Sequence, residues 1–165
     1  MKKAVISINY SGGIRGIELR SLTYGSLEQT DEGIYVTFEQ AKQQVVMENR
    51  FLIPYNQERP DLCFATPVVE YLDLLRNCHT DLQADDPLFY RALKSGKFSR
   101  QVVGQHKLSG LGKEIANRLG LDVPKSYTGH GWRRSSATEA ANQVRIQDLK
   151  PEQQYVHMYV SWVNC

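Results

Sequence analysis

The residues of this sequence with the clearest chemical potential are basic and lie far apart along the chain. Arg15 stands near the start, Lys42 follows a strand-like run, and two residues separate His130 from Arg133. Guanidinium groups are planar forks that bind phosphate oxygens in pairs, and they stay charged at any relevant pH. The set therefore predicts a phosphate-binding pocket, provided that the fold brings its members together.

Two motifs surround these residues. Residues 127–138 read YTGHGWRRSSAT, and residues 12–19 read GGIRGIEL. The first resembles the His-x-x-Arg box of tyrosine recombinases, with its preceding Thr-Gly and following Arg-x-Ser-Ala-Thr. The second is similar to the first-arginine motif of that family, in which a Gly-rich turn leads through Arg-x-x-Glu-Leu into a helix. Arg15 and His130 stand 115 residues apart, a separation typical of the family, and Lys42 matches its β-strand lysine.

The resemblance implies a mostly helical α+β catalytic domain with a small antiparallel sheet near its N-terminal third. It extends from Gly12 to about Tyr155, so we expect residues 1–165 to form one domain without the N-terminal core-binding domain that such enzymes usually carry. It is closest to the crypton-like recombinase domains of animals, which often lie inside larger nuclear proteins. We therefore expect an intracellular, nuclear location.

The resemblance also implies roles for the four residues. Strand cleavage by a tyrosine passes through a pentavalent transition state, whose non-bridging oxygens are stabilised by fixed cations without a metal. Arg15 and Arg133 would bind those oxygens, His130 would donate a further hydrogen bond or shuttle a proton, and Lys42 would protonate the departing 5′ oxygen. No cofactor, metal or small-molecule substrate is expected.

Each of these residues also has a purely structural interpretation. Arg15 and Glu18 have the spacing of a surface ion pair on a helix, which contributes a few tenths of a kcal/mol. Lys42 could be an ordinary exposed lysine, and His130 could belong to a helix cap. The order and spacing of all four residues together favour common ancestry with the recombinases over these alternatives.

The pattern breaks where the nucleophile should be. In the family a second His or Trp follows the Arg of His-x-x-Arg by about two dozen residues, and the nucleophilic tyrosine comes roughly nine later. Here Tyr155 stands 22 residues after Arg133 and Asn164 stands 31 after it. Tyr159 is only 26 residues past Arg133, and asparagine cannot form a phosphotyrosine bond. The sequence therefore predicts a catalytically retired domain.

Charge is distributed unevenly, although the formal net charge is only +2. Residues 58–86 hold seven acids against two bases, and residues 91–134 hold ten bases against two acids, a net of +8 for the second stretch. Clustered charge of one sign could face a polyanion, or could be an ordinary solvated surface. The expected nucleic-acid contacts are the four pocket residues together with Lys94, Lys97, Arg100, Lys107, Lys113, Lys125 and Arg134.

The elements that must position these side chains follow from hydrophobic spacing and turn signals. A helix is expected to end at residues 11–13, and a second to run from Ile14 to Leu22 with Ile14, Ile17 and Leu22 inward. Residues 30–33 (TDEG) predict a turn between strands at 22–27 and 34–38, and a third extended run covers 45–53. Further helices are expected after Pro67, over 108–119 with Gly120 as its end, and from about 128 to 141.

Bulk properties exclude several classes of protein. A chain of 165 residues can bury a core without disulfides or metals. Three cysteines, Cys63, Cys78 and Cys165, are an odd number without metal-site spacing, so we expect reduced thiols. No apolar run approaches the roughly 20 residues of a membrane helix, and polar residues interrupt the first apolar run too early for a signal peptide.

Three hypotheses follow. The first is a non-catalytic module that binds duplex DNA or chromatin through residues 91–134. The second is a protein-interaction or dimerisation domain with an obsolete DNA surface, whose partner patch would be Tyr155, Val156, Tyr159, Val160 and Trp162. The third is an active recombinase whose tyrosine is displaced to Tyr155 or Tyr159, or donated by another chain.

Overall fold

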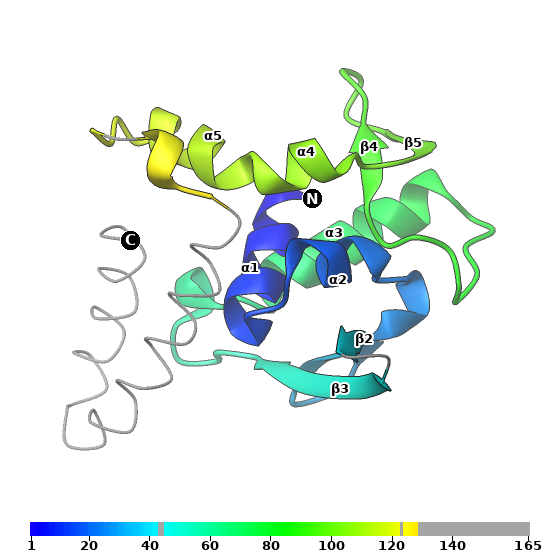
Figure 1. The fold of residues 1–165 in the computed structure, drawn as a ribbon. Coiled ribbons are helices and arrows are strands. Elements are labelled where there is room, and N and C mark those ends of the chain that lie inside the picture. Colours follow the sequence, from blue (N-terminus) through cyan, green and yellow to red (C-terminus); the bar gives the residue numbers. More distant parts are fainter. Residues whose placement is uncertain (43–44, 123, 129–165) are drawn as a thin grey trace, which may run out of the picture.

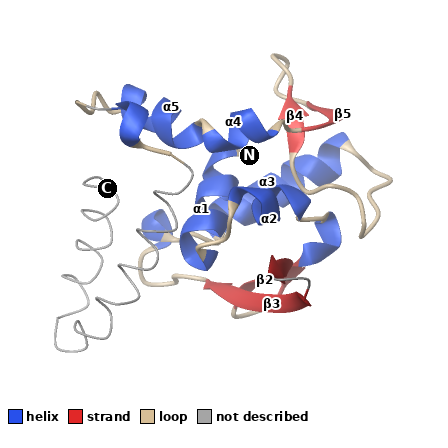
Figure 2. Cartoon of the chain, viewed as in Figure 1, coloured by secondary structure: helices blue, strands red, loops and turns tan. Residues whose placement is uncertain are grey.

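The fold is that of a computed structural model, which describes residues 1–42, 45–122 and 124–128. It is a mixed α+β domain with a small antiparallel sheet (Figure 1, Figure 2). The elements are, in chain order, α1 (Lys2–Gly12), α2 (Gly16–Ser21), β1 (Leu27–Gln29), β2 (Gly33–Lys42), β3 (Val45–Pro54), α3 (Thr66–Cys78), β4 (Tyr90–Ala92), β5 (Phe98–Val102), α4 (Gln105–Ser109) and α5 (Leu111–Arg118). Short 3-10 turns lie at Tyr24–Ser26, Pro60–Leu62 and Pro124–Ser126.

The first two helices meet at a glycine turn, as the sequence predicts. Helix α1 ends where Gly13 adopts a left-handed φ of 55° and its N–H donates to the Asn9 carbonyl. Only glycine adopts this conformation without strain, so the turn between the helices depends on it. A side chain at Gly12 would collide with the ring of Phe51, so the glycine allows α1 to lie close to β3.

The sheet has the order β1-β2-β3 with antiparallel pairing. Leu27 pairs with Val36 across the first hairpin, and Val36 pairs with Phe51 across the second. Strand residues alternate between faces, and Ile34, Val36 and Ile53 are fully buried on the face covered by helices. Figure 1 shows this sheet along the lower side of the domain, below α1 and α2.

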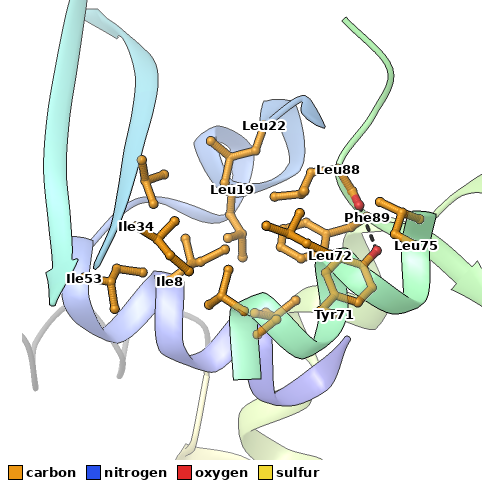
Figure 3. Packing of buried hydrophobic residues seen from close by; sticks show 14 of the residues in the cluster. Ile8, Leu19, Leu22, Ile34, Ile53, Tyr71, Leu72, Leu75, Leu88 and Phe89 are labelled. Atoms are coloured by element: carbon orange, nitrogen blue, oxygen red, sulfur yellow. Dashed lines mark hydrogen bonds between the residues drawn. The ribbon is translucent and has the colours of Figure 1, made fainter. Parts of the chain in front are cut away.

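One hydrophobic core joins the helices to the sheet. Figure 3 shows Ile8, Ile34 and Ile53 at the end of the core beside the sheet, with residues of α3 and the 88–89 segment at the other end. The hydroxyl of Tyr71 in α3 donates a 2.7 Å hydrogen bond to the carbonyl of Leu88. The core therefore fixes the chain just before it enters β4.

Several expectations about the elements are confirmed and others are wrong. The turn at 30–33, the strand ending at Pro54 and the helix after Pro67 are present. The first strand was expected at 22–27 but begins only at Leu27, because residues 24–26 form a 3-10 turn. Ile17 was expected inward but is 70% exposed. The expected helix over 108–119 is two helices that break at Gly110.

A second sheet was not expected. Strands β4 and β5 pair antiparallel and form a separate two-stranded hairpin. The helix expected from about 128 to 141 lies outside the described residues.

Candidate nucleic-acid interface

Arg15 lies at the start of α2, where the helix leaves backbone N–H groups without partners. The Glu18 carboxylate accepts the backbone N–H of Arg15 at 2.6 Å through Oε2. Its other oxygen, Oε1, accepts a 3.1 Å bond from Nη1 of the Arg15 guanidinium. One Glu18 carboxylate thus caps the N-terminus of α2 and binds the Arg15 guanidinium.

The Arg15–Glu18 ion pair, which the sequence offered as the structural alternative to a phosphate contact, is therefore present, and it is asymmetric in exposure. The Glu18 side chain is 6% exposed, whereas that of Arg15 is 41% exposed. A guanidinium has five N–H donors, and one hydrogen bond to a carboxylate does not exhaust them. The buried Glu18 carboxylate therefore orients the Arg15 guanidinium, whose remaining N–H donors are accessible to an external anion.

Lys42 is the last residue of β2 and pairs with Val45 across the turn to β3. Strand β2 packs against α2, the helix that Arg15 precedes. The side chain of Lys42 lies outside the described residues, as do His130, Arg133, Arg134, Tyr155 and Asn164. The convergence of the four pocket residues stays a prediction.

The other expected contact residues follow one another along β4–β5, α4, α5 and the turn after them. All six are exposed: Lys94, Lys97, Arg100, Lys107, Lys113 and Lys125. Figure 1 shows α5, α4 and the hairpin in a row along the upper side of the domain, away from the sheet of β1–β3. The elements that carry these exposed cations therefore follow one another in a row, and we call the six residues the basic strip.

The structure divides the basic strip into paired and unpaired cations. Arg100 is bridged to Asp81, and Lys107 contacts Glu114 at 3.3 Å. The remaining four lysines form no salt bridge among the described residues: Lys94, Lys97, Lys113 and Lys125. Their charge is not neutralised within this part of the chain and is available to an external polyanion.

Glu114 is the main acidic group within the strip. Its carboxylate contacts Lys2 of α1, Lys107 of α4 and Arg118 of α5. The hydrogen bond from Lys2 and then that from Lys107 lower the pKa of Glu114 below its ordinary value. One carboxylate thus links three helices while leaving an excess of positive charge around it.

Sequence reasoning placed Arg91 and Arg118 in the basic stretch 91–134 without naming them as contacts, and it missed Leu93. Arg91 and Leu93 belong to the unexpected hairpin, whose sequence signal is the Ser95-Gly96 pair between two short runs of alternating character.

Within the part of the chain that the structure describes, no three His, Cys, Asp or Glu side chains gather as a metal site. No helix among these described residues is long and apolar enough to cross a bilayer. The chain matches no protein-family model, and no curated protein matches it at a significant level.

Proposed function

We propose that this chain is a non-catalytic module, related to the tyrosine recombinases, that binds duplex DNA in the nucleus. The phosphate-gripping residues would be Arg15, Lys42, His130 and Arg133, and the basic strip would extend the contact along the duplex. The position expected for the nucleophile is Asn164, so strand cleavage is not part of the proposal.

The observation that carries the proposal is the row of lysines without acidic partners along β4–β5, α4, α5 and the turn that follows. Duplex DNA is a linear polyanion whose binding releases counterions from each neutralised phosphate. Arg15 adds to this, because a buried carboxylate holds its exposed guanidinium in one orientation. Preorganised donors lose less side-chain entropy when they bind an anion.

The test is the binding of a fluorescent 24-base-pair duplex, followed by anisotropy at several salt concentrations. We expect the wild-type chain to bind at low salt, and Arg15→Ala to weaken binding about tenfold, as loss of a charged hydrogen-bond donor does. Arg15→Lys keeps the charge beside Glu18 but lacks the planar fork, so it should recover only part of the loss.

Arg20→Ala is the matched control, because Arg20 is an exposed arginine at the other end of α2. It should bind DNA as the wild type does, and circular dichroism should show that all variants are folded. Absence of binding at low salt, or equal losses for the Arg15 and Arg20 variants, would overturn the proposal. A duplex with a nicked strand should trap no covalent adduct.

A further inference from the structure

The β4–β5 hairpin ends in a tight, projecting turn. The N–H of Leu93 donates to the Lys97 carbonyl at 2.8 Å, and the N–H of Gly96 donates to the Leu93 carbonyl at 3.1 Å. Gly96 has a φ of 82°, the left-handed conformation that closes this kind of three-residue loop. In Figure 1 the turn rises above the rest of the domain at its upper edge.

The two faces of the hairpin differ in character. Tyr90 and Phe98 are buried and anchor the inner face to the core, where Phe98 packs edge-on against Tyr71 with ring centroids 5.4 Å apart. Their neighbours Arg91, at the register irregularity between Tyr90 and Ala92, and Lys97, just before β5, are both exposed. The outer face is therefore free of core contacts.

An apolar side chain stands among cations on this outer surface. Leu93 is 46% exposed and is flanked by Lys94 in the turn and by Lys97, whose carbonyl accepts the Leu93 N–H just before β5. From Arg91 to Arg100 the chain holds four basic residues and no acid. A partner that suits this surface must be anionic and must also offer apolar groups between its charges.

The arrangement of the hairpin favours the major groove of DNA. Paired strands lie about 4.8 Å apart, so a two-stranded ribbon with its side chains fits the roughly 12 Å major groove and exceeds the roughly 6 Å minor groove. The groove walls are phosphates, and its floor carries the thymine methyl groups and the acceptor atoms of guanine. An anionic membrane would also offer charge and apolar groups, but the basic strip is a row, which matches a linear polyanion.

Arg91 is already oriented on the outer face. Its Nη1 donates a 3.1 Å hydrogen bond to Oε1 of Gln101 on the neighbouring strand. Arginine binds guanine O6 and N7 as a pair of acceptors, and the other donors of this guanidinium stay available for such a contact.

We propose that the β4–β5 hairpin enters the major groove of duplex DNA by its outer face. Leu93 contacts thymine methyl groups, Arg91 contacts guanine, and Lys94 and Lys97 contact the phosphates of the groove walls. This rests on the proposed DNA binding and assigns it an element and a groove. It also gives the chain a means of distinguishing base pairs, which phosphate contacts alone do not provide.

The test compares two duplexes of one mixed sequence, with thymine in one and uracil in the other. They differ only by methyl groups in the major groove, and their phosphates are unchanged. We expect the wild-type chain to prefer the thymine duplex by about fourfold, the effect of burying one methyl-sized group. Leu93→Ala should bind both duplexes equally.

Leu74→Ala is the matched control, because Leu74 on α3 is exposed to a similar degree, 49%. It should keep the preference for thymine. Lys94→Ala and Lys97→Ala should each make the log–log salt slope shallower by about 0.9 and leave the thymine preference intact. Arg50→Ala, which removes one charge from β3, should leave the slope unchanged.

The outcomes separate this inference from the proposed function. Binding of both duplexes with equal affinity by the wild-type chain would overturn the major-groove contact and leave DNA binding standing. A thymine preference that survives Leu93→Ala would overturn the role of the hairpin. Absence of binding to either duplex, with binding to phosphatidylserine vesicles that Leu93→Ala abolishes, would overturn both proposals in favour of a membrane surface.

Discussion

Tyr71 shows how one buried side chain connects the core to the basic hairpin. Its hydroxyl donates to the Leu88 carbonyl at 2.7 Å and accepts the backbone N–H of Tyr90 at 3.4 Å. Its ring stacks on Phe89 and meets the edge of Phe98 at the start of β5. A single residue of α3 therefore holds both strands of the hairpin at their base.

Replacing Tyr71 by phenylalanine keeps the ring and removes the hydroxyl. The Leu88 carbonyl and the Tyr90 N–H would then lack this buried partner, at a cost of about 1–3 kcal/mol. We expect urea unfolding of Tyr71→Phe to show a free energy of unfolding lower by that amount with an unchanged m-value. Equal midpoints for the two proteins would show that the hydroxyl contributes nothing.

Alkaline pH provides a separate readout of the same group. Burial raises the pKa of Tyr71 above the ordinary value, so the folded state holds the phenolic proton more tightly than the unfolded state. The contribution to stability is complete below the unfolded pKa of about 10 and is lost as the pH rises above it. Between pH 9 and 11 the wild type should therefore lose more stability than Tyr71→Phe.

At the scale of elements, the sequence predicted what periodicity and turn chemistry determine. The TDEG turn, Pro54 and Pro67 mark boundaries by local sterics, so β2, β3 and α3 were found, whereas β1 was misplaced. Ile17 was misplaced because Ile14 and Ile17 were read as one helical face. Helix α2 begins only at Gly16, so Ile14 precedes the helix and the three-residue spacing sets no common face.

Other elements depend on contacts that the sequence does not display. At Gly110 a side chain would come within 3.0 Å of the His106 carbonyl, and the chain breaks there into α4 and α5. Strand β4 is only three residues long and is stabilised by the burial of Tyr90 and Phe98 against α3. Tertiary packing, which local propensity does not report, decides both. Of the candidate site, the Arg15–Glu18 pair is the structural alternative that the i, i+3 spacing offered, and the hairpin was not predicted.

Glu114 is the element-scale link within the basic strip. Glu114→Gln removes the charge that holds Lys2, Lys107 and Arg118 together. Partly exposed ion pairs contribute little, so we expect a loss of less than about 1 kcal/mol at neutral pH. DNA affinity should rise, with a log–log salt slope steeper by about 1, because at least one released cation can contact a phosphate.

The lowered pKa of Glu114 supplies a check on this variant. A carboxyl group with a depressed folded pKa adds stability that is present above its ordinary pKa of about 4.3 and is lost as the pH falls through the folded value. Wild type and Glu114→Gln should therefore converge in stability under strongly acidic conditions. Tighter DNA binding with no change in salt slope would contradict the expectation that a cation released from Glu114 contacts a phosphate.

At the scale of the whole molecule, charge is separated between neighbouring segments. The acidic stretch 58–86 includes α3, and the basic stretch begins with the hairpin that packs on it. The Asp81–Arg100 bridge joins the two at their border, and the hydrogen bond from Arg100 lowers the pKa of Asp81. This polarity would repel DNA from one surface while attracting it to the other, which orients the domain on the duplex.

The strength of that field determines how steeply salt weakens DNA binding. Contact of the four unpaired lysines with phosphates contributes about −3.6 to the log–log salt slope, so raising salt from 50 to 200 mM should weaken binding by about 150-fold through these lysines alone. Replacing Lys94, Lys97, Lys113 and Lys125 together by alanine should make the slope shallower by about that amount. The control variant removes four charges elsewhere, by Arg20→Ala, Arg50→Ala, Arg59→Ala and Lys3→Ala. Its salt slope should be nearly that of the wild type, because long-range attraction depends on where cations cluster and not on net charge alone. Equal slopes for the two quadruple variants, measured by anisotropy over that range, would show that the basic strip is an ordinary solvated surface.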